Sequence, residues 1–442
     1  MNLEQTADKL ILHGLVVTMD ERLTVWDDGA VAIAGAEILA IGSSTDLSAR
    51  FMGPAVEVID ATGQLVMPGL INAHTHAADA LFRGWVDDLA LEPWLELLWV
   101  AERKFLRPET VRPGAQLAQA EMIRGGTTTA LDMFWFPEVS AQVAREVGFR
   151  LMTGPVYFDF AEPDNIPVEQ RSARGREFLQ EYQHDPLIVP CVTPHSTYTV
   201  SPSYLREAQA LAEEFGVLLT THASETTTEV RTVSQRYGQS PPRHLDQLGL
   251  LTPRTVLAHC VHLPDDEINL LAERQTVVAH CPMSNLKLGS GVAPLPKMRQ
   301  SGVQTTLGTD GPVSSNDLDM WAAMRLAAVL HKGVQQNPTL LLAQEVVKMV
   351  TCDAARALGL GDKVGSLAPG KQADLILIDL NRPHLTPRYD IYSPLVYAVG
   401  RDDVAMVLIQ GRVVMRNRQL MTVDEATVMA MVQDLAQEIK RG

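Results

Sequence analysis

Histidines stand where apolar runs of this sequence end, and the first pair shows what chemistry they offer. In "GLINAHTHAADALFRG", His74 and His76 lie one residue apart after the apolar residues 65–67. Side chains two residues apart on a strand point to the same side, so both imidazoles can reach one point. Imidazole is a common ligand of zinc and related ions. Two histidines alone are more often surface or hydrogen-bonded residues, so a metal site requires further ligands.

Further polar residues end other apolar runs in the same way. The runs "LIVPCVTPH", "VLLTTHASE", "TVLAHCVHL", "TVVAHCP" and "VQTTLGTD" supply His195, His222 with Glu225, His259, His280 and Asp310. A single histidine of this kind could be a hydrogen-bonded residue beside the core. Because five of the eight runs end in histidine and another in aspartate, coincidence explains the pattern poorly, and we predict one shared site.

The elements that must position these residues are parallel strands. Eight apolar runs alternate with helical patterns, which predicts an α/β fold with a (β/α)₈ barrel whose strands carry chemistry at their C-terminal ends. Short β-like runs before residue 69 return near the other end in "GKQADLILIDL" and "DVAMVLIQGRVVM". We therefore expect a small discontinuous β-sandwich domain from 1–68 and 366–442, around a barrel at 69–365.

Two helices are marked clearly. "SYLREAQALAEEFG" follows a serine and ends on Gly216, as a capped helix does. The last segment begins with a T-x-x-E pattern at Thr422 and Glu425, which predicts a capping box. Its apolar residues form one packing face, namely Val428, Val432, Leu435 and Ile439.

Composition limits the possible partners. The chain of 442 residues has a formal net charge of −16 and no basic run, which argues against a nucleic-acid polymer or an anionic membrane as partner. Its four cysteines lie far apart without a C-x-x-C pair, so we expect neither disulfides nor a thiolate zinc site. No long apolar run or leader segment is evident. We expect a cytoplasmic homo-oligomer with a small-molecule substrate.

Several motifs together resemble those of one family. "HTH", "HASE", "AHCVHL", "HCPMSNLKLGSGVAP" and "LGTDG" resemble the amidohydrolase superfamily, and more narrowly its adenosine-type deaminases that act on S-adenosylhomocysteine and 5′-methylthioadenosine. The similarity runs from "VVTMDE" to "GSLAPGKQADLILIDL". It implies hydrolytic deamination of an adenosine-like nucleoside, with release of ammonia and the inosine analogue.

The resemblance also implies a metal centre. Its ligands would be His74, His76, His222 and Asp310, holding one divalent ion, with zinc expected and iron(II) the other usual ion. Three imidazoles and a carboxylate leave a position open for water, as a catalytic site requires. Binuclear relatives add a modified lysine at the end of strand four, but "LIVPCVTPH" has no lysine. One metal per chain is therefore expected.

Glu225 is the expected general acid and base. It lies three residues beyond His222, close enough to take a proton from water and deliver it to a ring nitrogen or the leaving group. His259 and Asp310 would orient the attacking hydroxide, and Glu225 and Asp310 would also contact the substrate. A structural salt bridge near a helix start is the alternative role for Glu225.

Other residues are expected to bind the substrate. His195, in "TPHSTYTVSP", matches the family's purine-contacting histidine, and Glu102, in "WLELLWVAERKF", matches its ribose-binding glutamate. The helical pattern around Glu102 would equally allow it to face solvent. Trp94 and Trp99 would line the pocket or belong to the core. Residues expected to support the site from behind are His280, Ser284 and Asn285.

The family's deaminases of S-adenosylhomocysteine use arginines after strand three to hold the substrate carboxylate. Near the first expected position this chain has Gly154 and Pro155. Arg171 and Arg174 lie farther on, and Arg150 precedes the strand. Asp159 and Glu162 would repel a carboxylate if they faced the pocket. We therefore expect a neutral 5′ group, as in adenosine or 5′-methylthioadenosine.

Three other functions stay open at this point. One is an aminohydrolase or dechlorinating hydrolase of another N-heterocycle, such as guanine, a pterin or an s-triazine. A second is cyclic-amide hydrolysis at a binuclear site, which the missing lysine disfavours. A third is a non-enzymatic metal-binding protein, which the complete ligand set together with Glu225 disfavours.

Overall fold

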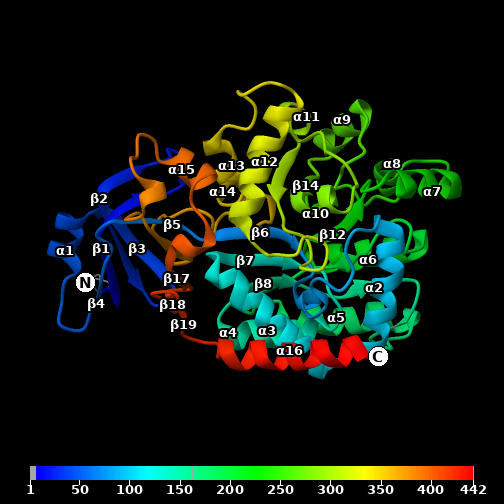
Figure 1. Cartoon of the computed structure of the whole chain (residues 1–442), viewed down its shortest axis with the longest axis horizontal. Coiled ribbons are helices and arrows are strands. Elements are labelled where there is room, and N and C mark those ends of the chain that lie inside the picture. The colour runs from blue at the N-terminus through cyan, green and yellow to red at the C-terminus, as the bar shows by residue number, and fades with distance from the viewer. Residues whose placement is uncertain (1–5, 162, 442) are drawn as a thin grey trace.

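The computed structural model describes residues 6–161 and 163–441. One nine-stranded sheet joins the two ends of the chain (Figure 1). From the N-terminal part come β1 (Lys9–Val17), β2 (Val25–Ala34), β3 (Glu37–Ser43), β4 (Glu57–Asp60) and β5 (Gln64–Pro68). From the C-terminal part come β16 (Leu375–Asp379), β17 (Val404–Ile409), β18 (Arg412–Arg416) and β19 (Gln419–Leu420). The predicted meeting of the two ends is present, because β5 and β16 pair antiparallel with Met67 opposite Ile376.

The strands between these two parts are all parallel. They are β6 (Leu70–Thr75), β7 (Thr127–Asp132), β8 (Arg150–Thr153), β9 (Val156–Tyr157), β10 (Ile188–Pro190), β11 (Thr193–Pro194), β12 (Leu219–Ala223), β13 (Thr255–His259), β14 (Val277–His280) and β15 (Gln304–Leu307). They form sheets in the orders β10-β8-β7-β6, β11-β9 and β12-β13-β14-β15. A bridge between Ser196 and His222 joins the second set to the third. The N–H of Asp310 donates to the carbonyl of His74 (3.0 Å), which joins the third set to the first.

Two expected strands are each divided in two. "RLMTGPVYFD" forms β8 and β9, and "LIVPCVTPH" forms β10 and β11. The division falls where the two segments touch, since a Cβ at Gly154 would lie 1.7 Å from the carbonyl oxygen of Cys191. Only glycine permits this approach of the two backbones.

Helices alternate with the parallel strands, as the sequence pattern predicts. The α-helices are α1 (Ser44–Phe51), α2 (Leu91–Phe105), α3 (Pro108–Arg124), α4 (Pro137–Val147), α5 (Arg171–Tyr182), α6 (Pro202–Phe215), α7 (Thr227–Tyr237), α8 (Pro241–Gln247), α9 (Asp265–Glu273), α10 (Pro282–Lys287), α11 (Leu295–Gln300), α12 (Met320–Val334), α13 (Ala343–Met349), α14 (Cys352–Ala357), α15 (Tyr392–Tyr397) and α16 (Glu425–Arg441). The 3₁₀ helices are η1 (Ala77–Phe82), η2 (Val168–Gln170), η3 (Pro383–Leu385) and η4 (Arg401–Asp403). Within the described ranges, no helix is both long and apolar enough to span a bilayer.

The two marked helices differ in how well their ends were predicted. α6 ends at Gly216, whose φ of 65° suits glycine, as expected. In α16 the predicted capping box is wrong, because the Thr422 hydroxyl makes no hydrogen bond within the described structure. Asp424 accepts from the N–H of Thr427 (3.2 Å) instead. The expected apolar face is present, with Val428, Val432 and Ile439 buried and Leu435 half-buried.

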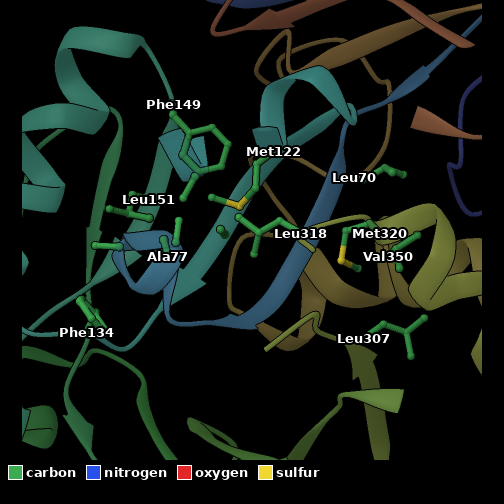
Figure 2. Close-up of a cluster of buried hydrophobic side chains, with 14 of the residues drawn as sticks. Leu70, Ala77, Met122, Phe134, Phe149, Leu151, Leu307, Leu318, Met320 and Val350 are labelled. Atoms are coloured by element: carbon green, nitrogen blue, oxygen red, sulfur yellow. The ribbon is translucent and has the colours of Figure 1, made fainter. Parts of the chain in front are cut away.

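Strands and helices share a continuous core. Figure 2 shows part of it, where Leu70 of β6, Met122 of α3, Leu151 of β8 and Met320 of α12 lie among other buried side chains. Parallel strands covered on both faces read as unbroken apolar runs, which explains the sequence pattern. Burying one such side chain contributes about 1.5–3 kcal/mol. This core fixes the strand ends that carry the polar residues.

Candidate active site

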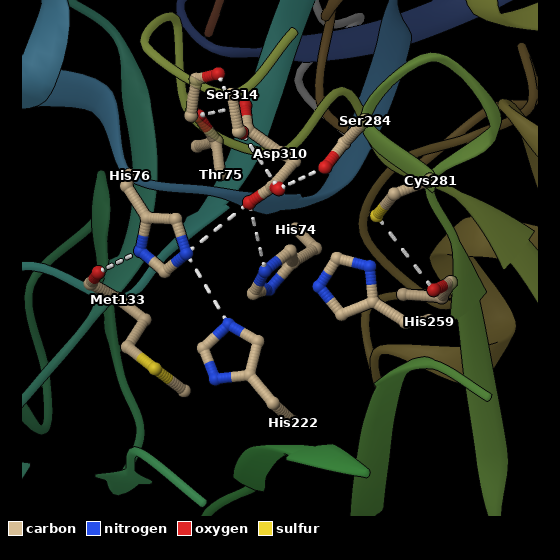
Figure 3. Close-up of polar contacts among 12 residues, drawn as sticks. His74, Thr75, His76, Met133, His222, His259, Cys281, Ser284, Asp310 and Ser314 are labelled. Carbon is tan, nitrogen blue, oxygen red and sulfur yellow. Dashed lines mark hydrogen bonds and ion pairs between the residues drawn. The ribbon is translucent and has the colours of Figure 1, made fainter. Parts of the chain in front are cut away.

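Four histidines and one aspartate converge where the parallel strands end. His74 lies near the end of β6 and His76 just beyond it, His222 lies in β12, His259 ends β13, and Asp310 follows β15 (Figure 3). Asp310 Oδ1 is 3.4 Å from His74 Nε2 and 3.2 Å from His76 Nε2. His76 Nε2 is also 3.2 Å from His222 Nε2. Five of the residues that the strand-end argument selected therefore lie close together.

The tightest group differs by one member from the ligand set expected from sequence. Ligand atoms of His74, His222, His259 and Asp310 lie within 4.8 Å of one another. This group contains His259, whereas the expected set contains His76. His76 still contacts both Asp310 and His222. All five side chains therefore surround one small volume.

Hydrogen bonds from behind fix the orientation of the imidazoles. His222 Nδ1 bonds to the carbonyl of His195 (2.7 Å), and His259 Nδ1 bonds to Asn285 Oδ1 (2.8 Å). His76 Nδ1 bonds to the carbonyl of Met133. These bonds leave each Nε2 available to a common ligand, as supporting contacts around metal sites do.

Asp310 is held in the same way. Ser284 and Ser314 donate to its Oδ2 at 2.6 and 2.7 Å, so the expected support from Ser284 is present. His280 behaves differently, because neither of its nitrogens has a hydrogen-bond partner among the described residues. Its ring neighbours His331 at 5.8 Å between centroids. His280 therefore gives the site no hydrogen bond.

Backbone geometry at the site is unusual. His259 and Asp310 have φ of 72° and 65°, a left-handed conformation that non-glycine residues rarely adopt. A Cβ at Gly308 would lie 2.9 Å from backbone atoms of His74. Gly308, the first glycine of "LGTDG", therefore lets the end of β15 approach β6 closely enough for Asp310 to reach His74.

The ionisation of three members of the cluster suits a bound cation. His76 differs, because burial acts to lower its pKa but Asp310 outweighs burial and raises the pKa of His76 to about 10, so His76 binds an ion only after it loses this proton. Burial lowers the pKa of His74 to about 4 and that of His222 well below its usual value, so both imidazoles are neutral and can act as ligands. Burial acts to raise the pKa of Asp310, but the neighbouring imidazoles outweigh it and hold this carboxylate ionised. Both nitrogens of His74 and Asp310 Oδ1 are buried without a hydrogen bond in the part of the chain that is described. A divalent ion would satisfy Asp310 Oδ1 and one nitrogen of His74 together.

Glu225 lies beside this cluster. It is 5% exposed, and its Oε2 is 3.7 Å from His259 Nε2. Among the described residues its ion-pair partner is His259, a member of the cluster, and no lysine or arginine pairs with it. Burial raises its pKa well above the usual value for a glutamate. Its backbone N–H donates to Glu229 Oε2 (2.7 Å), which fixes this segment before α7.

A pocket opens from the cluster and is largely aromatic. The space inside it is about 630 Å³ when the open solvent at its mouth is included. The apolar side chains that line it include Leu91, Trp94, Leu95, Leu98, Trp99, Phe134, Trp135 and Phe158. Both tryptophans of α2 that the sequence singled out are therefore pocket residues.

Glu102 and His195 also line the pocket. Glu102 is 5% exposed and accepts a hydrogen bond from Trp135 Nε1 (3.2 Å), so it does not face solvent. Burial raises its pKa to about 7. His195 stacks on Phe158 (4.5 Å between centroids), and its Nδ1 bonds to Thr199 Oγ1 (2.8 Å). These contacts leave His195 Nε2 for a ligand.

Sequence reasoning missed four polar residues here. Asp79 and Tyr198 line the pocket, and Ser314 binds Asp310. Asp132 ends β7 and accepts from the N–H of Ala77 (2.6 Å), which anchors η1 next to His76. The strand-end argument could have found Asp132. The other three lie in loops or 3₁₀ turns, where no periodicity marks them.

The arginines after β8 do not reach the pocket. Arg171 is 3% exposed, pairs with Asp164 (2.8 Å) and donates to backbone carbonyls. Arg174 is exposed and pairs with Glu177, and Arg150 is buried against Asp374. Among the side chains that line the pocket, none in the described residues is lysine or arginine.

The expected acidic neighbours of the pocket also differ. Asp159 is exposed and accepts from the N–H of Ser201 (3.0 Å), so it does not face the pocket. Glu162 lies outside the described residues. Repulsion of a carboxylate by Asp159 is therefore not part of this site.

The fold and this site define the class of protein. The amidohydrolase family matches residues 65–414, and the chain belongs to this family. A 5-methylthioadenosine/S-adenosylhomocysteine deaminase of Syntrophobacter fumaroxidans is 44% identical over 435 residues, which are 98% of this chain and 99% of the relative.

Two further proteins are similar over nearly their whole lengths. A 5′-deoxyadenosine deaminase of Methanothermobacter thermautotrophicus is 40% identical over 93% of this chain and 99% of its own. The crystal structure of an adenosine deaminase from Xanthomonas campestris with bound zinc has a TM-score of 0.96 and 38% identity. The similarity covers 99% of this chain and 100% of that one.

Proposed function

We propose that this chain is a metal-dependent hydrolytic deaminase of adenosine-like nucleosides, which releases ammonia and the inosine analogue. The observation that carries the proposal is the buried cluster of histidines and Asp310 at the floor of an aromatic pocket that also contains Glu102 and Glu225. Relatives named as deaminases of such nucleosides, at 40–44% identity, support it.

The residues that would hold the metal are His74, His76, His222 and Asp310, with one divalent ion per chain and zinc expected. The atoms of His74 and Asp310 that have no hydrogen bond in the described structure fit such an ion, and a structural relative contains zinc. When bound, the ion would lower the pKa of water enough to allow attack at neutral pH. Iron(II) is the other ion that this donor set accepts.

The remaining residues supply proton transfer and binding. Glu225 would take the proton of the attacking water and pass it to the ring nitrogen or the departing amine, because its raised pKa lets it hold a proton. His259, 3.7 Å from Glu225, and Asp310 would orient the attacking oxygen. His195 would bond to a purine nitrogen and Glu102 to the ribose hydroxyls.

We also propose the larger architecture from the same observations. Residues 69–365 would form a (β/α)₈ barrel, since the chain runs from the first set of parallel strands directly into the second. Backbone bonds link the second set to the third and the third to the first. Residues 1–68 and 366–442 would form the small β-sandwich domain. The four cysteines are free, which suits a reducing cytoplasm.

Ammonia release from a panel of amino-heterocycles tests the function. We expect zinc-loaded protein to deaminate adenosine, 5′-methylthioadenosine or 5′-deoxyadenosine far faster than guanine, a pterin or an s-triazine. Preference for one of the latter three would make the alternative heterocycle hydrolase correct. If no nucleoside or heterocycle releases ammonia or chloride, the chain is not an aminohydrolase or dechlorinating hydrolase of this kind.

A further inference from the structure

One buried carboxyl group in the pocket has no role in the chemistry described above. Asp79 lies in η1, three residues beyond His76, and is 2% exposed. It lines the same pocket as Glu102. Its Oδ1 makes no hydrogen bond in the described structure. Burying a polar oxygen without a partner costs roughly 1–3 kcal/mol, so this atom needs a ligand group.

The surroundings of Asp79 define which kind of group it can meet. Its Oδ2 lies against Gly311, where a Cβ would come within 2.1 Å, so the carboxyl cannot turn further in that direction. Among the described residues that line the pocket, there is no lysine or arginine that could form a salt bridge with Asp79. Most of the other lining side chains are apolar. The oxygen is therefore placed to meet a hydrogen-bond donor that arrives with the substrate.

Asp79 and Glu102 line the same pocket. Burial is the main cause that raises the pKa of Asp79, and the charges of Asp310 and Glu102 act in the same direction. Two carboxyl groups at the edge of an aromatic pocket match a pair of adjacent hydroxyls better than a single hydroxyl, because each hydroxyl can donate to its own acceptor. A sugar with a vicinal diol has that arrangement.

We propose that Asp79 is a second sugar-binding residue, which accepts a hydrogen bond from one hydroxyl of the ribose while Glu102 accepts from the other. The assignment rests on the proposed nucleoside deaminase function. It makes the intact 2′,3′-diol, and not the base alone, a determinant of specificity.

The experiment compares substrates that differ by one hydroxyl. kcat/KM is measured for adenosine, 2′-deoxyadenosine and 3′-deoxyadenosine with wild type, Asp79→Asn, Asp79→Ala and Glu102→Gln, all zinc-loaded. For Asp79→Ala we expect a loss of about 10- to 100-fold on adenosine, but a much smaller loss on the analogue that lacks the partner hydroxyl. Asp79→Asn should lose less, because its amide oxygen can still accept. Glu102→Gln should also lower kcat/KM for adenosine, but its loss should be much smaller on the analogue that lacks the other hydroxyl.

Glu267→Gln is the matched control, because Glu267 is a buried carboxyl in α9 that does not line the pocket. It should change kcat/KM for the three nucleosides by the same factor. An equal loss on all three nucleosides with Asp79→Ala, or loss of zinc from that variant, would overturn the proposal. If wild type deaminates none of these three nucleosides and neither 5′-methylthioadenosine nor 5′-deoxyadenosine, the proposed function fails instead, so the two failures are distinguishable.

Discussion

Asp310 shows how one residue serves two demands at this site. Its Oδ1 faces His74 and His76, while Ser284 and Ser314 occupy its Oδ2. The two serines hold the carboxylate in place, and the free oxygen stays available for an ion. A left-handed φ of 65° at Asp310 adds to the cost of this placement, and the surrounding contacts must offset that cost.

Glu225→Gln tests the proton transfer. The amide cannot accept the proton of water, so kcat should fall by roughly 100-fold or more. The metal content should stay as in wild type, because the proposed ligands are unchanged. Turnover measured by ammonia release and metal measured by elemental analysis check this prediction. Near wild-type turnover would remove Glu225 from the mechanism.

His222→Ala tests the metal site. Removal of one imidazole should abolish both bound zinc and activity, since metal affinity depends on the complete set of ligands. Wild type reconstituted with excess zinc should retain one ion per chain. His262→Ala is the control, because His262 bonds to the carbonyl of Ser290 and lies outside the cluster. Two tightly held ions per active chain would contradict the proposed centre.

For single residues, the sequence predicts which side chains lie close together but not which of them bind the metal. The sequence identifies four of them because each stands at the end of an apolar run that predicts a strand, namely His74, His222, His259 and Asp310. Whether His76 or His259 completes the ligand set depends on ring orientations, which hydrogen bonds to distant residues determine. Asp79 escaped notice because its burial comes from contacts with segments far away in sequence.

Helix α2 forms much of the pocket wall. The sequence of this helix does not show whether Glu102 faces the pocket or the solvent. Trp94, Leu98 and Glu102 line the pocket, whereas Leu97 and Val100 are exposed. From the sequence alone, Glu102 could have lain on either side, because the helix has large apolar residues on both. Tertiary packing decides this, and local pattern cannot.

The segment from β9 to α5 determines the expected response to a charged 5′ group. Arg171 is committed to Asp164 and to backbone carbonyls of this segment, so it cannot clamp a substrate carboxylate. We expect kcat/KM for S-adenosylhomocysteine to be at least about tenfold below that for 5′-methylthioadenosine, because a charge-assisted contact is missing. Steady-state kinetics on both nucleosides check this.

The control for that comparison is Arg174→Ala. Arg174 is exposed and pairs with Glu177, so its removal should leave the ratio of the two kcat/KM values unchanged. A preference for S-adenosylhomocysteine that Arg174→Ala or Arg171→Ala abolishes would show that a carboxylate clamp exists in this segment.

Across the whole molecule, one buried ion pair joins the two groups of strands. Arg150 of β8 pairs with Asp374, just before β16, at 2.9 Å, and both side chains are 1% exposed. Asp374 also accepts from the N–H of Gln410 (2.8 Å). The pair thus links the parallel strands to the sheet formed by the chain ends. The sequence predicted both groups of strands, but not this link, because its partners are 224 residues apart.

Arg150→Met should lower the free energy of unfolding by about 3–5 kcal/mol, because it leaves Asp374 buried and unpaired. Arg176→Ala, which removes an exposed pair with Glu214, should cost no more than about 1 kcal/mol. Chemical denaturation of both variants measures the difference. Equal, small effects would show that the buried pair contributes no more than a surface pair. The expected homo-oligomer is a separate prediction at this scale, which light scattering checks.

The position of β5 between β1 and β16 also determines an order of events during synthesis. β5 ends at Pro68 and its antiparallel neighbour β16 begins at Leu375. At roughly 5–20 residues per second, the ribosome needs about 15–60 s to make the intervening chain. During that interval one edge of β5 presents unpaired N–H and C=O groups, which other strands can join. The C-terminal segment is therefore the last piece to close the sheet, and a chain interrupted before β16 leaves that edge open.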